Sequence, residues 1–448
     1  MAERVSAREA IALVSDGFTE QQLADLPDAG DGPLGWEGYG AQRDRAARRT
    51  GSAESVVYGT ALLGGTECVL ISFEFGFLGG SLSERAGDRL EAAYGLARER
   101  RLPLVSLIAT GGSRMQEGMI ALGQLQRVAR ASVLLREAGV AHIAVLRDPT
   151  TGGGWATLGA GADVILALPG AQVGFAGSRV RPADADPAAY TAEGQLAAGQ
   201  IDAVVPPGSL RETLAFWVKA LAPAAVAGER EPVEPPRALG AGGEPARTGW
   251  DAVRQARGAE RPRAEAYLDD YFTRREPLRG DRCGGEDPGM LCGVGLRDGR
   301  PVAYVAQGGT ATRPAGYRTA ARVVRLADRL GLPVLTLIDT PGAANDAEAE
   351  RSGAGAAIAE LFTTMAAART PLTSLLIGEG GSGGALALAA PGNTWATPAS
   401  YFSVIAPELA AAILKRSPDQ VPHLADQLRL RPEDLVELGV VRGIVGPG

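Results

Sequence analysis

The second half of this chain repeats the first at a constant offset of 230 residues. The segment LPLVSLIATGG at 102–112 lies over LPVLTLIDTPG at 332–342 without a gap, and Gly152-Gly153-Gly154 falls on Ser382-Gly383-Gly384. Each repeated unit has about 200 residues, enough to bury a core of its own. The repeat therefore predicts two copies of one domain rather than a solenoid of short repeats.

Within each copy, short apolar strands alternate with glycine turns and amphipathic helices. In the first copy, a strand at 104–108 leads through the turn Gly111-Gly112 into a helix at 115–138. Strands that are apolar throughout are covered on both faces, which favours a mainly parallel sheet with crossover helices and an α/β fold. The helix is expected to bury one apolar face, formed by Met119, Leu122, Leu125, Val128 and Val133.

Composition shifts divide the chain into four segments. We expect an N-terminal clasp at 1–50, a first domain at 51–222, a Pro- and Gly-rich linker at 223–247 and a second domain at 248–448.

Charge and cysteine content exclude several classes of protein. The net charge is −7, and only two of the 45 cationic residues, Lys219 and Lys415, are lysines, so a nucleic-acid partner is not expected. The three cysteines are too scattered for a zinc site or a disulfide framework, which indicates a reducing cytoplasm and no metal. No apolar run predicts a signal core or a membrane span.

The glycine turns are the main candidates for chemistry. Main-chain N–H groups at helix starts can bind an anion or a developing oxyanion, and glycine lets a ligand oxygen approach closely. Any single Gly-Gly pair is more simply explained as a sharp turn, but several pairs at matched positions favour a site. Side chains for acid–base work are scarce: His142 is expected to lie in a buried strand, and Glu117, Glu379 and Asp339 to be solvated or to cap helices.

At these residues the chain resembles the carboxyltransferase component of biotin-dependent acetyl-CoA carboxylase, with a β-subunit-like half ahead of an α-subunit-like half. The β-like motifs are FLGGS at 77–81, GGSRMQEG at 111–118, DPTTGG at 148–153 and GFAG at 174–177. The α-like motifs are ERPR at 260–263, RGDR at 279–282, GYR at 316–318, IDTPG at 338–342, GEGGSGGA at 378–385 and SVIAPE at 403–408.

The resemblance implies two crotonase-like domains, each built of repeated ββα units that stack into a superhelix. It implies a first oxyanion pair, Gly111 and Gly112, for the acyl thioester and a second, Gly384 and Ala385, for the ureido oxygen of biotin. Further acyl-CoA contacts are expected from Gly79, Gly80, Arg114, Gly152, Gly153, Gly174, Phe175, Ala176 and Gly177. Further biotin contacts are expected from Gly342, Gly380, Gly381, Gly383, Val404 and Ile405.

The activity implied is transfer of a carboxyl group from carboxybiotin to acetyl-CoA or a related acyl thioester, giving a malonyl-type product for fatty acid or polyketide synthesis. No biotin-attachment motif is present, so a separate biotin carboxyl carrier protein and a biotin carboxylase are expected partners, and the chain is expected to form a homodimer or a higher homo-oligomer. Two alternatives are a biotin-independent malonyl-thioester decarboxylase or transcarboxylase and a non-catalytic acyl-CoA-binding subunit.

Three features depart from the family pattern. The four-cysteine zinc ribbon of the β subunits is not found, so no metal is carried over. The loop at 307–313 is short and has no lysine, and Ala343 to Asp346 replaces a segment that is usually richer in proline and glycine. A specialised carboxylase is therefore as consistent with the sequence as a housekeeping one.

Overall fold

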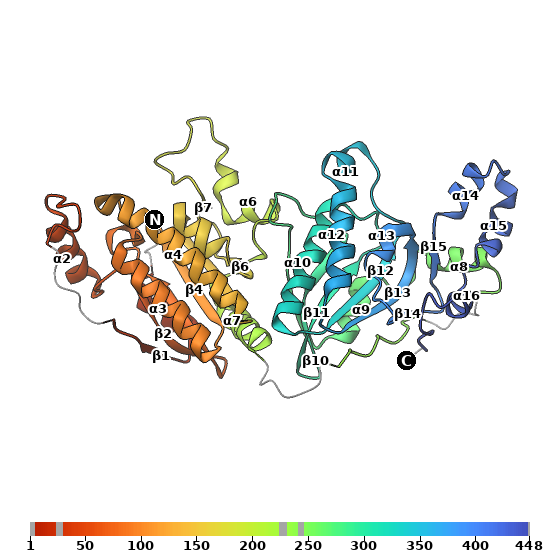
Figure 1. Ribbon diagram of the computed structural model, residues 1–448, viewed down its shortest axis with the longest axis horizontal. Coiled ribbons are helices and arrows are strands. Elements are labelled where there is room, and N and C mark those ends of the chain that lie inside the picture. Colours follow the sequence, from red (N-terminus) through yellow and green to blue (C-terminus); the bar gives the residue numbers. More distant parts are fainter. Residues whose placement is uncertain (1–4, 24–29, 224–230, 241–245, 447–448) are drawn as a thin grey trace. The chain divides into compact units, whose positions relative to one another are not determined.

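A computed structural model describes residues 5–23, 30–223, 231–240 and 246–446. The chain divides into two compact units, Met1–Ala227 and Gly228–Gly448, each with its own sheet (Figure 1). Parts of the expected linker, 224–230 and 241–245, lie outside the described residues. Its described part, 231–240, packs on unit 2: Val233 is buried, and its carbonyl accepts a hydrogen bond from Thr373 Oγ1 at 2.7 Å.

The sheet of unit 1 has the strand order β1-β2-β3-β4-β5-β6-β8, with β7 paired to β5. Pairing is antiparallel between β1, β2 and β3 and parallel from β3 onward, as the apolar runs predicted for the central strands. The strands are β1 Gly17–Glu20, β2 Val56–Leu63, β3 Thr66–Phe73, β4 Leu104–Thr110, β5 His142–Thr151, β6 Val164–Ala167, β7 Val173–Gly174 and β8 Ala203–Val204.

Helices α3 and α4 lie side by side along this sheet (Figure 1). The side chain of Ser83 caps α3 by accepting a hydrogen bond from the Ala86 N–H, and Arg101 ends the helix in the left-handed conformation. The helices are α1 Ala7–Val14, α2 Tyr39–Thr50, α3 Glu84–Arg100, α4 Gly118–Glu137, α5 Gly152–Gly154, α6 Ala192–Ala197 and α7 Pro207–Leu221.

The buried face expected for α4 is largely wrong. Met119 and Leu122 are exposed, and so is Val133. Small and polar residues face inward instead, because α4 packs closely against α3 and leaves little room for long side chains. The buried residues of α4 are Ala121, Gln124, Val128, Ala131 and Leu135.

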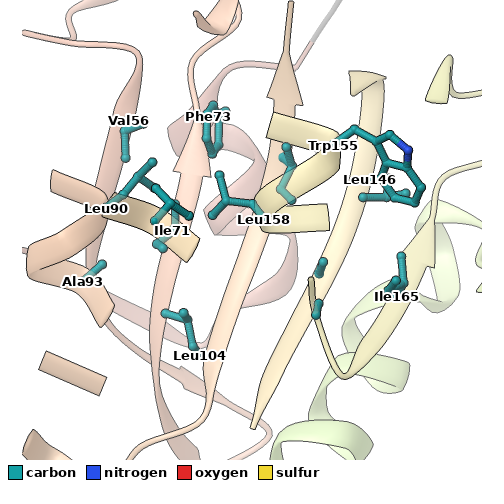
Figure 2. Packing of buried hydrophobic residues seen from close by; sticks show 14 of the residues in the cluster. Val56, Ile71, Phe73, Leu90, Ala93, Leu104, Leu146, Trp155, Leu158 and Ile165 are labelled. Carbon is teal, nitrogen blue, oxygen red and sulfur yellow. The ribbon is translucent and has the colours of Figure 1, made fainter. Parts of the chain in front are cut away.

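The core of unit 1 lies between the sheet and the helices that cover it (Figure 2). Ile71 and Leu104 project from neighbouring parallel strands toward Leu90 of α3, and Leu158 and Trp155 extend the cluster beyond β5. Each such side chain contributes about 1.5–3 kcal/mol when fully buried. This packing holds the carboxyl ends of β4 and β5 in a fixed register.

His142 is buried at the start of β5, as expected from the sequence. Its Nε2 lies 2.9 Å from Ser106 Oγ, and its ring packs edge-to-face on Tyr94. Burial lowers the pKa of His142 from 6.5 to about 4, so the imidazole is neutral in the folded protein.

This histidine predicts an acid-sensitive fold. Between pH 6.5 and 4 the unfolded chain binds a proton that the folded chain excludes, so stability falls with pH, by about 3 kcal/mol in all. Urea unfolding at a series of pH values should show this loss in the wild type, and less of it in His142→Asn. The same substitution at the exposed His423 is the control. An equal pH dependence in the wild type and His142→Asn would refute the assignment.

Unit 2 repeats the architecture with the strand order β14-β13-β12-β11-β10-β9, and β15 pairs with β13. Helices α10 and α12 pack together along the sheet (Figure 1). The strands are β9 Arg274–Pro277, β10 Met290–Arg297, β11 Arg300–Gln307, β12 Val334–Thr340, β13 Leu372–Gly381, β14 Thr394–Ala396 and β15 Tyr401–Ser403. The helices are α8 Gly249–Ala256, α9 Ala264–Tyr271, α10 Pro314–Leu330, α11 Ala347–Arg351, α12 Ala354–Ala367, α13 Ser382–Leu386, α14 Pro407–Ile413, α15 Val421–Gln427 and α16 Pro432–Glu437.

The two units share irregular details as well as strand order. The register of β4 with β5 shifts between Ile108 and Thr110, and that of β12 with β13 shifts between Ile338 and Thr340. The isolated bridge between Leu82 and Ser113 recurs between Thr312 and Ala343. All these positions are 230 residues apart, which confirms the duplication predicted from the sequence.

Among the described helices, none has both the length and the apolar character needed to cross a membrane. The described residues also contain no cluster of three or more His, Cys, Asp or Glu side chains suited to a metal ion.

Candidate functional site

In unit 1, two glycine turns meet at the carboxyl ends of the adjacent parallel strands β4 and β5. Gly112 follows β4 with φ +108°, and Gly152 follows β5 with φ +63°. A Cβ atom on Gly152 would lie only 3.1 Å from the Gly112 Cα, so the two backbones are in close contact. Both the left-handed dihedrals and the close approach require glycine.

The predicted first pair, Gly111 and Gly112, is wrong in its choice of amides. The Gly111 N–H donates to the Gly79 carbonyl at 2.9 Å, and the Gly112 N–H donates to Thr110 Oγ1 at 3.1 Å. Both donors are therefore used within the turn.

The next amide, that of Ser113, points the other way. Ser113 pairs with Leu82 in a parallel bridge whose hydrogen bonds use the Gly112 carbonyl and the Arg114 N–H. In such a bridge the N–H of the central residue faces away from the partner strand. No residue in the described part of the chain accepts a hydrogen bond from the Ser113 N–H.

The second turn of unit 1 starts helix α5. The Gly152 N–H donates to the Phe175 carbonyl at 3.0 Å, which leaves the Gly153 amide as the next donor. Amides in the first turn of a helix have no acceptor within that helix. Ser113 and Gly153 are therefore the unit 1 amides that a ligand oxygen could use.

Unit 2 builds the same arrangement. Gly342 has φ +137° and donates to Thr340 Oγ1 at 3.1 Å, as Gly112 does to Thr110. Ser382 takes the place of Gly152 and keeps a positive φ of +57°, a strained conformation for a residue with a side chain. A Cβ atom on Gly384 would lie 2.5 Å from the Ala343 amide nitrogen, so α13 starts directly beside the turn.

In the second predicted pair, Gly384 lies where a donor is needed and Ala385 does not. Gly384 is the third residue of α13, within the turn whose amides lack helical acceptors, and Ala385 is the fourth. Ala343, the equivalent of Ser113, also has no acceptor for its N–H among the described residues. The sequence reasoning missed Ser113 and Ala343, although each directly follows a turn glycine and could have been found by that signal.

Comparison with known proteins agrees with these paired turns. Residues 36–205 match the carboxyl transferase domain, and residues 246–447 match the acetyl co-enzyme A carboxylase carboxyltransferase-like family. The chain is 40% identical to the acetyl-coenzyme A carboxylase carboxyl transferase subunits beta/alpha of Salinispora tropica, over 99% of this chain and 82% of the relative.

The chain belongs to the carboxyl transferase family of biotin-dependent acyl-CoA carboxylases. A probable biotin-dependent acyl-coenzyme A carboxylase beta3 subunit of Mycobacterium bovis is 33% identical over 91% of this chain and 83% of the relative.

The fold matches that of transcarboxylase 12S, a hexamer solved with methylmalonyl-coenzyme A and methylmalonic acid bound. The TM-score is 0.79 at 19% identity, over 99% of this chain and 86% of that one. The two units are thus crotonase-type α/β domains, as the resemblance implied.

In this carboxyltransferase, Arg114 does not face a substrate, contrary to the prediction. It is 1% exposed and donates from Nη2 to Glu54 Oε1 at 2.6 Å and from Nη1 to Glu54 Oε2 at 3.0 Å. Although burial alone would raise the pKa of Glu54, the guanidinium holds it below its usual value, so the pair is ionised. Arg114 also donates from Nε to Ser81 Oγ, which ties the 79–81 turn to the turn at 111–113.

Glu117 caps a helix, as expected, but is buried rather than solvated. One carboxylate oxygen accepts the Glu84 N–H at 2.7 Å at the start of α3, and the other accepts the Tyr39 hydroxyl at 2.5 Å. Since Tyr39 also contacts Arg114 at 3.1 Å, one buried network supports the first turn from beneath.

Asp339 was expected to be solvated or capping but is fully buried at the end of β12. It forms ion pairs with Arg261 at 2.5 Å and Arg263 at 3.2 Å, and it accepts the Glu379 N–H at 3.1 Å. Glu379 in turn accepts from Arg257 Nε and from the Tyr401 hydroxyl, both at 2.8 Å. These carboxylates brace the second turn, and their arginine partners come from segments far away in the sequence.

The other predicted contact residues divide into packing and exposed groups. Gly80 and Gly381 are packing glycines, because a Cβ on either would lie about 2 Å from a backbone carbonyl oxygen, at 2.1 and 2.0 Å respectively. Phe175 and Val404 are exposed, at 73% and 72%, on the loops that follow the turns. The remaining predicted residues lie on these same turns and loops: Gly79, Gly174, Ala176, Gly177, Gly380, Gly383 and Ile405.

Proposed function

We propose that the chain transfers a carboxyl group from carboxybiotin, carried on a separate protein, to acetyl-CoA or a related acyl-CoA. The observation that carries this proposal is the recurrence of one amide arrangement in both units, with Ser113 and Gly153 in unit 1 and Ala343 and Gly384 in unit 2. Two donor sites suit a reaction in which negative charge develops on two oxygens.

The amides of unit 1 would bind the thioester oxygen and stabilise the charge that builds on it when the α-carbon loses its proton. Those of unit 2 would bind the ureido oxygen of biotin, for which two converging N–H donors are a fitting set. Bound carboxybiotin supplies the carboxyl group. The chemistry then needs no histidine from the protein, in agreement with the burial of His142.

The alternatives make different predictions in one assay. The full-length protein is mixed with carboxylated carrier and a panel of acyl-CoAs, and carboxylated products are measured by mass spectrometry. Product from at least one acyl-CoA supports the proposal. Turnover of malonyl-CoA without biotin would indicate a decarboxylase, and thermal stabilisation by CoA with no turnover would indicate a binding subunit. Both of the latter outcomes contradict the proposal.

We further propose that a biotin carboxyl carrier protein and a biotin carboxylase are partners, that the protein acts in the cytoplasm, and that its product feeds fatty acid or polyketide synthesis. A homodimer or higher homo-oligomer is supported by exposed apolar side chains beside the turns of unit 1, namely Met115, Met119 and Phe175. Light scattering of the purified protein would measure its oligomeric state.

A further inference from the structure

Gln307, at the end of β11, contacts both backbone segments that carry the unit 2 amides. Its Nε2 donates to the Gly384 carbonyl at 3.1 Å and to Thr312 Oγ1 at 3.2 Å. Thr312 is the bridge partner of Ala343: its N–H donates to the Gly342 carbonyl and its carbonyl accepts the Ala344 N–H. One buried amide thus connects the turn after β12 to the start of α13.

A second donor reaches the same carbonyl. The Tyr317 hydroxyl donates to the Gly384 oxygen at 3.2 Å, and the Tyr317 side chain is fully buried. Burial raises the pKa of Tyr317, so its hydroxyl remains protonated and able to donate. With five residues, α13 has few internal hydrogen bonds to fix its direction, and these two side chains hold it by one carbonyl.

Unit 1 serves as an internal comparison. At the positions 230 residues earlier, Phe77, Leu82 and Gly87 replace Gln307, Thr312 and Tyr317. None of the three has a side-chain hydrogen-bond donor, yet unit 1 forms the same bridge, bulge and helix start. The fold therefore does not need the polar contacts that unit 2 places under Gly384.

Gln307 is also an unfavourable choice for stability alone. It is fully buried, and its Oε1 has no hydrogen-bond partner among the described residues. An unpaired buried acceptor is destabilising, and an apolar side chain of similar size would avoid that cost. A residue retained in such a place points to a role in the site.

We propose that Gln307 and Tyr317 are positioning residues that hold Gly384 by its carbonyl and so aim its N–H, beside that of Ala343, at a bound oxygen. A helical residue points its N–H and C=O in opposite directions along the axis, so fixing the carbonyl fixes the amide. The inference rests on the proposed carboxyl transfer for its consequence in turnover, but the geometric part can be measured independently.

The test uses full-length Gln307→Met and Tyr317→Phe. The control is Tyr304→Phe, which removes another buried tyrosine hydroxyl from unit 2, away from α13. Hydrogen–deuterium exchange of peptides covering 378–390 is measured by mass spectrometry, and transfer from malonyl-CoA to biocytin is assayed in parallel. We expect faster exchange in both variants and kcat about 10- to 100-fold lower, with the KM for malonyl-CoA within about twofold of wild type. Tyr304→Phe should match the wild type.

Wild-type exchange at 378–390 in both variants would overturn the inference, as would unchanged kcat in variants that exchange faster. If the wild type itself transfers no carboxyl group, the proposed function fails, and the exchange measurement still decides whether these side chains hold Gly384.

Discussion

Replacing Ser113 with proline is expected to lower the rate of carboxyl transfer by at least about 100-fold, whereas replacing it with alanine should leave the rate near that of the wild type. Loss of one oxyanion donor typically costs about 100- to 1,000-fold in kcat. Proline removes the N–H that the structure leaves free, and alanine removes only the hydroxyl. Ala343 holds the equivalent position in unit 2, so alanine is compatible with this turn.

The proline substitution should leave unit 1 folded. The bridge to Leu82 uses the Gly112 carbonyl and the Arg114 N–H, and neither is changed at position 113. Steady-state assays with malonyl-CoA and biocytin measure the effect, and circular dichroism with urea unfolding confirms the fold. A folded Ser113→Pro protein with wild-type turnover would remove this amide from the mechanism, and equal losses in Ser113→Ala would point to the hydroxyl instead.

Replacing Arg114 with methionine is expected to destabilise unit 1 by about 3–5 kcal/mol, because it leaves the buried carboxylate of Glu54 without its counter-ion. The melting temperature of a unit of this size should fall by about 6–20 °C. Urea unfolding followed by tryptophan fluorescence measures the change, in a background with Trp250→Phe and Trp395→Phe so that the signal comes from unit 1.

Two controls separate the buried ion pair from other effects. Arg100→Met removes one partner of an exposed pair with Glu67 at 2.9 Å and should change stability by less than about 1 kcal/mol. The double variant Glu54→Leu, Arg114→Met should be more stable than Arg114→Met alone, since no unpaired charge remains. If Arg114→Met instead kept full stability and raised the KM for acyl-CoA, the predicted substrate contact would be right after all.

Local patterns were sufficient to predict the turns but not the atoms that act. Gly111-Gly112 and Gly383-Gly384 mark the right places, because only glycine tolerates a positive φ or a backbone 2–3 Å nearer than a side chain allows. Which amide is free depends on the carbonyl of Gly79 and on the bridge to Leu82, both far away in the sequence. The pairing of strands therefore moved the donors by one residue in each turn.

Charged residues were the least predictable part of the site. Arg114 lies within a motif that resembles a substrate loop, and nothing near it in the sequence indicates that Glu54 neutralises it in the core. Asp339 likewise meets Arg261 and Arg263 only because helix α9 and strand β12 belong to one packed unit. The face of α4 was misjudged for the same reason, since contact with α3 selects small residues where periodicity favoured Met119 and Leu122.

The sequence by itself determined the duplication, the α/β class and the positions of the glycine turns, because these follow from local rules: apolar runs form buried strands, and left-handed turns need glycine. Only the tertiary structure decided which N–H groups remain without acceptors, which carboxylates are neutralised, and that Gln307 and Tyr317 hold Gly384 in one unit while Phe77 and Gly87 stand in their places in the other. Hydrogen-bond and ion-pair partners are set by packing between distant segments, and that packing is not encoded in any short stretch of chain.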